Sequence, residues 1–363
     1  MLNRDLWRGR PVLVTGHTGF KGGWLTSWLL ALGAKVAGFS LPAEGPPSFF
    51  EACDVGARCR SLIGDLRNLD AVRAAFEGAG PNLVFHLAAQ PIVLKSFEDP
   101  VGTFATNVMG TAHVLEAARS CPSVESVVVI TSDKCYENRE WLWGYREDEA
   151  LGGHDPYSAS KGCAEIVTAA YRRSFGANRE RKLAIASARA GNVFGGGDWA
   201  ANRIIPDAAR AVLDGLPLTL RNPGSVRPWQ HVLDVLHGYL MLAERLLEGQ
   251  REFESAWNFG PPEAATFTVA ELADRFFRAW GKGSWRGAQA GPAPHEARQL
   301  KLDSSRARAL LGWRPRLELD RALELTAEWY RGSLCSSGAG RMIELTEKQI
   351  EYVETTAAGA RAS

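Results

Sequence analysis

The chain has 363 residues, of which 45% are hydrophobic, and a formal net charge of +1. This length can bury a large core and suffices for two or three domains. No basic run or zinc-type cysteine spacing indicates nucleic-acid or metal binding, and no apolar stretch is long enough to span a membrane. We therefore expect a cytoplasmic globular protein whose six cysteines remain thiols.

Short apolar strands alternate with helices through the first half of the chain. Strands are predicted at residues 11–16, 35–40, 59–65, 81–89, 124–132 and 182–192. Helices are predicted at residues 24–33, 104–119 and 155–176. Strands that are apolar almost throughout are typical of a parallel sheet with helices on both faces. The predicted fold class is α/β, with a doubly wound parallel sheet of the Rossmann type.

Turn-forming residues become frequent after about residue 190. The runs "GGGDW" and "NPGSVRPW" are rich in glycine and proline, and helices are predicted at 204–213 and 269–280. We expect a smaller, interwoven C-terminal substrate domain here. The predicted domains are residues 1–190 with a return at about 230–255, residues 191–335, and a C-terminal tail over 336–363.

A glycine-rich turn, "TGHTGFKGG", lies between the first strand and the first helix. Gly16, Gly19 and Gly22 have the G-x-x-G-x-x-G spacing that lets a diphosphate approach the backbone. The N-terminus of the following helix offers unpaired N–H groups and a partial positive charge to that anion. A purely structural turn is the alternative, but the strand–turn–helix context favours a dinucleotide site.

The end of the second strand bears on the choice of cofactor. Ser40 stands where NAD-preferring units usually carry an acid that holds the ribose, so this residue does not itself select NAD. Glu44 lies a little further on. No arginine follows the strand immediately to receive the 2′-phosphate of NADP, and NAD is therefore the predicted cofactor.

Further cofactor contacts are expected where the other parallel strands end, because ligands bind at that edge of the sheet. Asp65 could accept from the adenine amine, and small residues after the fourth strand leave room for the cofactor. The predicted cofactor-binding residues are Gly16, His17, Thr18, Gly19, Phe20, Lys21, Gly22, Ser40, Asp65, Leu66, Leu87, Ala88, Ala89, Gln90, Asn107, Thr131, Tyr157 and Lys161.

Tyr157 and Lys161 are spaced i, i+4 near the start of one helix and so share a face. A phenol has an unperturbed pKa of about 10, which makes it a poor base. A neighbouring lysine and a positive nicotinamide ring would favour the phenolate, which could then take a hydroxyl proton. A solvated helix face is the alternative interpretation of this pair.

The chain resembles the extended short-chain dehydrogenase/reductase family from about residue 10 to 330. The resemblance rests on "TGHTGFKG", "GDL", "HLAAQ", "TSDKCY" and "YSASK". It implies that Ser132 completes a catalytic triad with Tyr157 and Lys161 by donating a hydrogen bond to the reacting oxygen.

Asp133 and Lys134 follow this serine, where epimerases of the family usually have small or neutral residues. An acid and a base beside a hydride site permit elimination of water. Tyr157 would deprotonate the sugar 4-hydroxyl as hydride passes to NAD, Lys134 would remove the C5 proton, and Asp133 would protonate the departing 6-hydroxyl. Hydride would then return to C6 and a proton to C5. General acid or base assistance contributes about 10²–10⁴-fold in rate.

An Asp-Lys pair at this position resembles the CDP-glucose 4,6-dehydratases within the family. "NREWLWGYREDE", "GGHDPYS", "RAGNVFGGGDWA" and "RPWQHV" strengthen that resemblance. It predicts a lyase that converts CDP-glucose to CDP-4-keto-6-deoxyglucose. Lys134 could be the base or an electrostatic partner of Asp133. The alternatives are a nucleotide-sugar 4-epimerase, a dehydratase for dTDP- or GDP-sugars, a non-catalytic NAD sensor, and a solvated loop in which the acid–base pair does no chemistry.

The substrate diphosphate requires cations and amide donors. By resemblance, Asn192, Arg203 and Arg227 are predicted to bind it, and His231 to approach it. His86 and Lys95 are predicted to line the sugar pocket.

The loop that carries Trp141, Trp143 and Tyr145 could cover the site or pack against the body of the protein. The resemblance also implies a homodimer, formed through the 104–119 helix and the helix that bears Tyr157.

Overall fold

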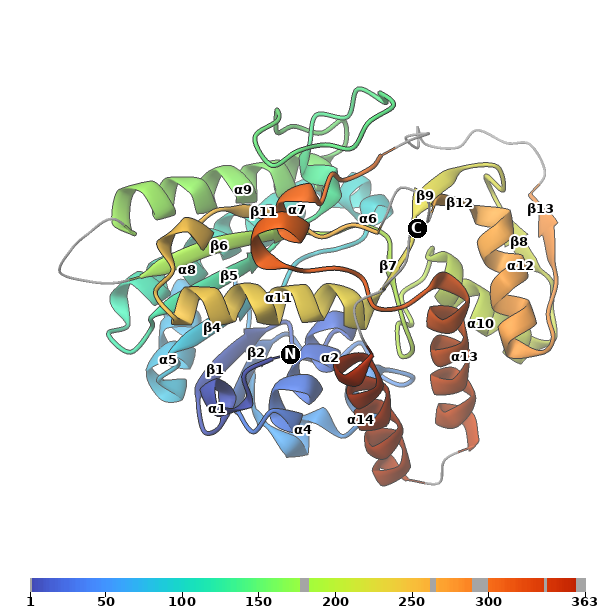
Figure 1. Cartoon of the computed structure of the whole chain (residues 1–363), viewed down its shortest axis with the longest axis horizontal. Helices are drawn as coiled ribbons and strands as arrows, with labels where there is room; N and C mark the ends of the chain where they lie inside the picture. The colour runs from blue at the N-terminus through green and yellow to red at the C-terminus, as the bar shows by residue number, and fades with distance from the viewer. Residues whose placement is uncertain (1, 177–182, 262–265, 289–299, 336–337, 357–363) are drawn as a thin grey trace.

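A computed structural model of the chain describes residues 2–176, 183–261, 266–288, 300–335 and 338–356. A seven-stranded parallel sheet forms the body of the protein (Figure 1). Across the sheet the strands are β11 (Ala256–Asn258), β6 (Ala184–Arg189), β5 (Ser126–Ile130), β4 (Leu83–His86), β1 (Pro11–Thr15), β2 (Lys35–Ser40) and β3 (Arg60–Ile63). The strand order reverses at β1, the place where doubly wound sheets bind ligands. The predicted α/β fold is confirmed.

Helices cover both faces of this sheet. One layer contains α5 (Leu69–Ala79), α8 (Gly110–Ser120) and α9 (Pro156–Phe175), and the other contains α2 (Phe20–Ala31), α11 (Val232–Leu247) and α14 (Ala339–Thr355). Along β5, Val127 and Val129 pack in the first layer and Val128 packs in the second. Because both faces are covered, every residue of β5 is buried, which explains why all of them but Ser126 are apolar.

The predicted helix at 104–119 belongs to a longer helical path. It runs from α7 (Pro100–Phe104) through a π-helical turn, η1 (Ala105–Met109), into α8. A π-turn adds a residue to the helix and shifts the side chains that it presents. This shift brings Asn107 toward α9, as described below.

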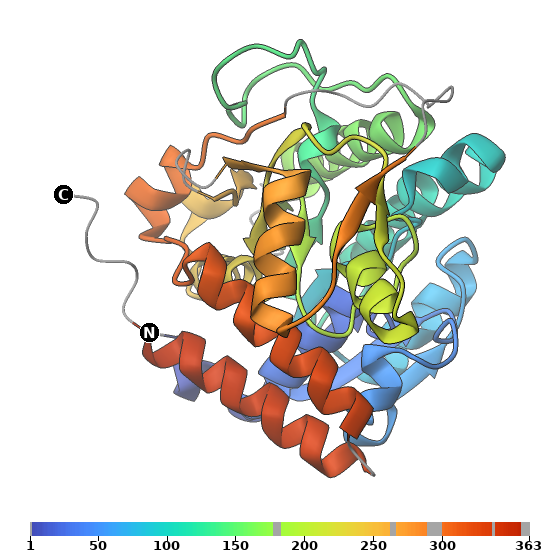
Figure 2. The same cartoon turned by 90° about the vertical axis from the view of Figure 1, so that its right-hand side faces the viewer.

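The remaining strands are short, and most of the remaining elements lie beside the carboxyl edge of the sheet (Figure 2). The strands are β7 (Val193–Phe194), β8 (Leu218–Leu220), β9 (Val226–Pro228), β10 (Gln230–His231), β12 (Thr266–Thr268) and β13 (Trp285–Gly287), which pair as β10–β7, β12–β9 and β13–β8. The α-helices are α1 (Arg4–Trp7), α3 (Phe49–Ala52), α4 (Val55–Arg58), α6 (Val93–Glu98), α10 (Ile204–Asp214), α12 (Val269–Trp280) and α13 (Leu319–Cys335). The 3₁₀ helices are η2 (Asp133–Cys135) and η3 (Arg251–Phe253), and η5 (Ala307–Leu311) is a π-turn.

Residues beyond 190 return to the main sheet in two places. Helix α11 packs against β5 and β6, and β11 adds a seventh strand that the sequence did not predict. The division into domains stays a prediction. Within the segment expected as a tail, α14 packs on α2 and α3, and Glu354 accepts a hydrogen bond from Trp28 Nε1 at 2.6 Å.

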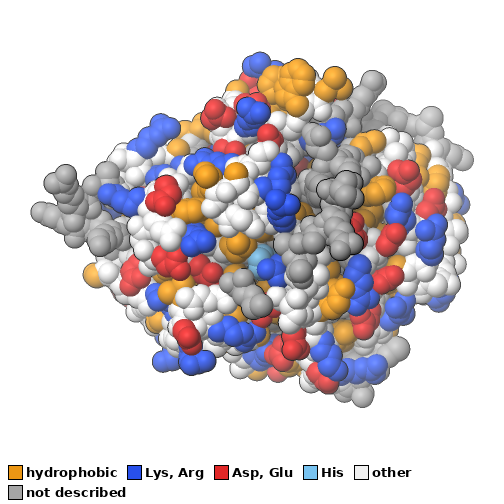
Figure 3. Space-filling view, in the orientation of Figure 1, with side chains coloured by type: hydrophobic (Ala, Val, Ile, Leu, Met, Phe, Trp, Pro, Cys, Tyr) orange, Lys and Arg blue, Asp and Glu red, His pale blue; other side chains and the backbone are white. Residues whose placement is uncertain are grey.

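Acidic and basic side chains are interspersed on the face shown in Figure 3, in keeping with the near-neutral net charge. Within the described ranges, no helix combines the length and apolarity needed to cross a bilayer.

Candidate active site

The glycine turn follows β1 and leads directly into α2. Gly16 has φ +81°, and a Cβ there would lie 2.8 Å from the amide nitrogen of Ala88, so only glycine allows β1 and β4 to end this closely. A Cβ at Gly22 would lie 2.0 Å from the carbonyl oxygen of Gly16. At Gly19, by contrast, a Cβ would meet only the Gly16 carbonyl, at 3.4 Å. The turn is therefore tightly packed at Gly16 and Gly22, whereas the space beside Gly19, the N-cap of α2, is open.

The side chains of the turn have different roles. His17 is buried, its Nε2 lies 2.7 Å from Ser61 Oγ, and burial lowers its pKa to about 4. Its ring thus packs between the turn and β3, and what it can offer a cofactor is its backbone. The Thr18 hydroxyl lies 2.8 Å from Ser40 Oγ and donates to the carbonyl of Leu41 at 3.0 Å. Ser40 therefore packs against the glycine turn through its contact with Thr18.

The residues after β3 and β4 close the other sides of this site. Asp65 forms a bidentate pair with Arg67, which lowers the pKa of its carboxyl. Leu66 is buried beneath α8. Gln90 accepts from Asn107 Nδ2 at 3.1 Å through its carbonyl and donates its amide N–H to Asn107 Oδ1 at 2.8 Å.

Asn107 also donates to Ser160 Oγ on α9 at 2.8 Å. Its side chain is therefore fully engaged in joining the π-turn, the end of β4 and the helix that carries Tyr157. Leu87, Ala88 and Ala89 lie at the same edge and are only partly or moderately buried. These predicted cofactor residues lie together at this edge of the sheet. The side chain of Asn107 holds the neighbouring elements in position through its hydrogen bonds to Gln90 and Ser160.

Ser132, Asp133 and Tyr157 meet where β5 ends. Ser132 caps η2, donates to Asp133 Oδ1 at 2.9 Å and lies within hydrogen-bonding reach of the Tyr157 phenol. Asp133 is 3% exposed and packs tightly on Gly191, where a Cβ would lie 1.8 Å from its Oδ2. Lys134 is half-buried.

Tyr157 and Lys161 occupy the first two turns of α9, whose N-cap, Asp155, accepts a hydrogen bond from the Ser158 amide at 2.9 Å. Burial raises the pKa of Tyr157 to about 12, and the hydrogen bond with Ser132 opposes that rise. Burial lowers the pKa of Lys161 to about 8, opposed by the Glu165 carboxylate. In the protein alone the phenol is thus neutral, and a further positive charge is needed to form the phenolate.

Lys21 belongs to the catalytic end of the site. Burial, then Arg203 and Lys161, lower the pKa of its ammonium to about 8, and Asp133 and Asp198 oppose this shift. A lysine in the first turn of a helix faces an unfavourable helix dipole. The carboxylates of Asp133 and Asp198 offset part of that cost.

The "GGGDW" run brings a carboxylate to the predicted diphosphate site. Gly196 packs directly on Trp329 of α13, where a Cβ would lie 2.3 Å from the tryptophan side chain. This contact positions Asp198, which pairs with Arg203 at 2.9 Å. Arg203 also lies near Tyr157, since its charge acts on the phenol. Arg203 therefore sits beside the catalytic residues, with Asn192 in the loop after β6 at φ +48°.

Two predicted substrate residues are placed differently by the structure. His86 is 2% exposed, and its ring nitrogens lie 2.8 Å from Thr15 Oγ1 and 3.0 Å from Thr111 Oγ1. His231 is 1% exposed and caps α11 through its Nδ1, which accepts from the Leu233 amide at 3.3 Å. Alternation along a strand and capping of a helix turn both rings into the core, and their contact with substrate stays a prediction.

The other two predicted cations lie nearer the surface than these histidines. Lys95 is exposed on α6. Arg227 lies in β9, and its Nη1 donates to the carbonyl of Val226 at 3.0 Å.

The aromatic loop after η2 packs against the body of the protein at its base. Tyr145 stacks on Tyr136 at 5.1 Å and on Trp141 at 5.0 Å between ring centroids. Tyr145 also bridges to Leu302. Trp143 is 61% exposed near the tip. The structure therefore favours packing at the base of the loop and leaves its tip in solvent.

A buried ionic network lies directly beneath the catalytic residues, and the sequence reasoning missed it. Glu165 pairs with Arg189 at 2.8 Å, and both side chains are at most 4% exposed. Ser187 Oγ donates to Glu165 at 2.8 Å, and Thr131 donates to its other oxygen. Thr131, predicted to contact the cofactor, thus directs its hydroxyl into the core. The spacing of Glu165 four residues after Lys161 was the available signal.

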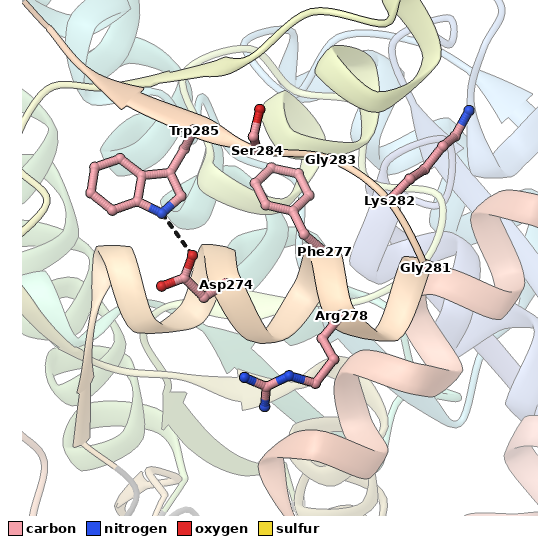
Figure 4. Close-up of a pocket in the computed structure, with 8 residues that line it drawn as sticks. All are labelled: Asp274, Phe277, Arg278, Gly281, Lys282, Gly283, Ser284 and Trp285. Atoms are coloured by element: carbon pink, nitrogen blue, oxygen red, sulfur yellow. Dashed lines mark hydrogen bonds between the residues drawn. The ribbon is translucent and has the colours of Figure 1, made fainter.

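A separate surface hollow of about 680 Å³ lies between the end of α12 and β13 (Figure 4). Trp285 Nε1 donates to Asp274 at 2.8 Å across it, and Arg278 and Lys282 lie at its rim. None of the predicted site residues lines this hollow. Among the described residues, no group of three metal-ligating side chains could hold an ion.

The chain is similar to proteins of known activity along most of its length. It is 47% identical over 334 residues to CDP-glucose 4,6-dehydratase of Salmonella typhimurium, covering 91% of this chain and 93% of that protein. It is 30% identical to dTDP-glucose 4,6-dehydratase of Streptomyces griseus, covering 88% and 93%.

Two solved structures have the same architecture. UDP-glucose 4-epimerase of Thermus thermophilus in complex with NAD has a TM-score of 0.76 and 30% identity, covering 88% of this chain and 99% of that chain. DesIV, a dTDP-glucose 4,6-dehydratase of Streptomyces venezuelae solved with NAD bound, has a TM-score of 0.75 and 28% identity, covering 88% and 96%. Residues 12–260 match the model of a family that is described as NAD dependent epimerase/dehydratase. The chain belongs to the NAD dependent epimerase/dehydratase family.

Proposed function

We propose that this protein is a sugar-nucleotide 4,6-dehydratase that converts CDP-glucose to CDP-4-keto-6-deoxyglucose and water. The observation that carries the proposal is the buried Asp133 carboxyl, which lies between Ser132 and Gly191 and acts electrostatically on Tyr157. A 4-epimerase has no step that requires a proton donor for a departing hydroxyl. The 47% identity to a CDP-glucose 4,6-dehydratase supports both the reaction and the substrate.

The glycine turn fits a dinucleotide. Gly19 caps α2 without a side chain, and the space over its Cα is open, so a diphosphate can reach the N–H groups of the first helical turn. Gly16 and Gly22 keep the turn close to β4 and α2. Bound NAD would supply a reversible hydride acceptor beside Tyr157 and the positive charge that favours its phenolate.

The chain's own groups then account for the proton transfers. Tyr157 takes the proton of the sugar 4-hydroxyl, with Ser132 hydrogen-bonded to the reacting oxygen. The resulting ketone acidifies the C5–H, whose proton passes to Lys134. Asp133, in its protonated form, delivers a proton to the 6-hydroxyl, which leaves as water. Lys134 would then return its proton to C5 as the hydride taken from C4 is added at C6. Acid or base assistance of this kind is worth about 10²–10⁴-fold for each group.

Arg203, Arg227 and Asn192 are proposed to bind the substrate diphosphate. Each guanidinium group can bind two phosphate oxygens at once, so Arg203 and Arg227 are suited to a diphosphate. Arg203 is already held by Asp198 at 2.9 Å, so it is oriented before the substrate arrives. Lys21 lies close enough to Arg203 for the two charges to interact, and it adds positive charge to this part of the site.

The test is a panel of sugar nucleotides incubated with the purified protein, without added NAD. Mass spectrometry is expected to show that CDP-glucose loses one water and that UDP-, dTDP- and GDP-glucose do not. Inversion of a sugar without loss of mass would identify a 4-epimerase instead. Loss of water from another nucleotide sugar would retain the reaction and correct the substrate.

We further propose a homodimer. Apolar side chains on α6, α7, η1 and α9 lie in solvent, namely Phe97 (54% exposed), Val101 (77%), Phe104 (37%), Met109 (52%) and Ile166 (57%). Because α7, η1 and α8 contact α9, these residues belong to one surface. A second copy would cover that surface. We place the enzyme in the cytoplasm because five of the six cysteines, Cys53, Cys59, Cys121, Cys135 and Cys163, are thiols.

A further inference from the structure

Lys161 is the buried cation on which the proposed proton transfer to Tyr157 depends, and it needs a counter-charge. Its side chain is 6% exposed, and burial lowers the pKa of its ammonium to about 8. Without a neighbouring anion, a buried lysine loses its proton. The structure places Glu165 one helical turn further along α9, on the same face.

Other titratable groups also face Lys161, from three other elements. Cys135 of η2 is a buried thiol whose pKa is raised, and His86 of β4 has a pKa lowered to about 3, so both are neutral. Lys21 of α2 is a second cation. Of these groups, Glu165 is the one that carries a negative charge.

Burial opposes ionisation of Glu165, but three partners reverse this. Arg189 pairs with it at 2.8 Å, Ser187 and Thr131 donate hydrogen bonds, and the pKa of the carboxyl falls below its ordinary value. Arg172 adds a further positive charge nearby. The carboxylate is therefore ionised in the core of the protein.

Arg189 is in turn held from its other side. Its Nη1 donates to Tyr136 OH at 2.6 Å and to the carbonyl of Glu147 at 3.0 Å, and its guanidinium lies 4.9 Å from the centroid of the Tyr136 ring. Tyr136 donates to Asn258 at 2.8 Å. The pair is thus anchored to β11 and to the segment that follows η2.

We propose that Glu165, held ionised by Arg189, is a positioning residue that keeps Lys161 protonated beside Tyr157. The inference rests on the proposed function for its catalytic consequence, but the charge state of Lys161 can be measured without turnover. A buried Glu–Arg pair is not in itself stabilising relative to an apolar pair, so a purely structural role would not require these two charges.

The experiment compares Glu165→Gln with the double variant Glu165→Gln/Arg189→Met. The single variant leaves Arg189 buried and unpaired, which can prevent folding, whereas the double variant removes both charges. Glu244→Gln is the matched control. Glu244 is also a partly buried glutamate, and it accepts two hydrogen bonds from residues distant in sequence, Trp7 and Asn3.

The primary measurement is a pH titration of protein labelled with ¹³C at the lysine ε-carbon, without cofactor. The resonance that disappears in Lys161→Met is assigned to Lys161. Its midpoint is expected near pH 8 in the native protein and about one to two pH units lower in both Glu165 variants, since the Glu165 carboxylate is the main charge that raises this pKa. Glu244→Gln should titrate like the native protein.

A second measurement is the pH dependence of kcat/KM for CDP-glucose. Its alkaline limb should move to lower pH by the same interval, because Lys161 loses its proton earlier. If the double variant folds and Lys161 still titrates near pH 8, the proposal is overturned, whatever the activity. If no variant or native protein turns over CDP-glucose, the proposed function fails while the NMR titration still decides the role of Glu165.

Discussion

Gly191→Ala should disable the proposed elimination by moving a single carboxylate. An added Cβ would lie 1.8 Å from Asp133 Oδ2 and 2.1 Å from its Cγ, whereas ordinary van der Waals contact begins near 3.4 Å. The φ of Gly191 is not in the left-handed region, so the backbone accepts alanine and the side chain of Asp133 must retreat. That movement would break its 2.9 Å hydrogen bond with Ser132.

The expected effect is large on turnover and moderate on stability. A misplacement of about 1 Å can cost about 10²-fold in rate, and loss of acid assistance about 10²–10⁴-fold, so we expect kcat to fall by about 10²-fold or more. Overpacking typically costs about 1–3 kcal/mol of folding stability. NAD affinity should be unchanged.

The assay follows dehydration of CDP-glucose by mass spectrometry, with NAD binding measured by calorimetry and folding by thermal denaturation. Gly340→Ala is the matched control, because a Cβ at Gly340 would meet nothing within 4 Å. A folded Gly191→Ala protein with native turnover would refute the placement of Asp133 as the acid.

Three further predictions test other parts of the protein. Lys134→Ala should retain NAD binding and lose about 10²–10⁴-fold in dehydration, as measured by product formation; full activity would place the C5 base elsewhere. Val101→Glu should yield monomers by light scattering, because Val101 is 77% exposed on the proposed dimer surface and its replacement leaves the core intact; an unchanged dimer mass would exclude that surface. Asp234→Asn should stabilise the protein at pH 8 by up to ~4 kcal/mol, because burial raises the pKa of Asp234 to about 7 from 3.8. The folded state binds the proton more tightly, so wild-type stability falls as pH rises from about 4 to 7. The gain in Tm should therefore be present at pH 8 and absent near pH 4, and a gain independent of pH would contradict this reasoning.

Local sequence patterns determined most elements of the main sheet. β1 and β5 were predictable because a strand buried on both faces is apolar at nearly every position. The start of α9 was predictable because Asp155 and Pro156 act within one turn of the chain. β11 was not predicted, since three residues carry no periodic signal and become a strand only by pairing with β6.

The same distinction holds for the site. Two sets of residues are close in the chain, and the spacing of each predicts its role. The spacing of Gly16, Gly19 and Gly22 predicts a dinucleotide-binding turn, and that of Tyr157 and Lys161 predicts a catalytic pair. His86 and His231 have residue types that suit a binding site, but the direction of a side chain depends on which neighbours bury it.

The sequence by itself therefore determined the family, the strand–turn–helix of the dinucleotide site and the helix that carries the catalytic pair. Tertiary structure alone decided that Glu165 meets Arg189 beneath that pair and that Gly191 holds Asp133 in place. The physical reason is that these contacts join residues 24 and 58 positions apart, and such contacts depend on how strands are ordered in the sheet.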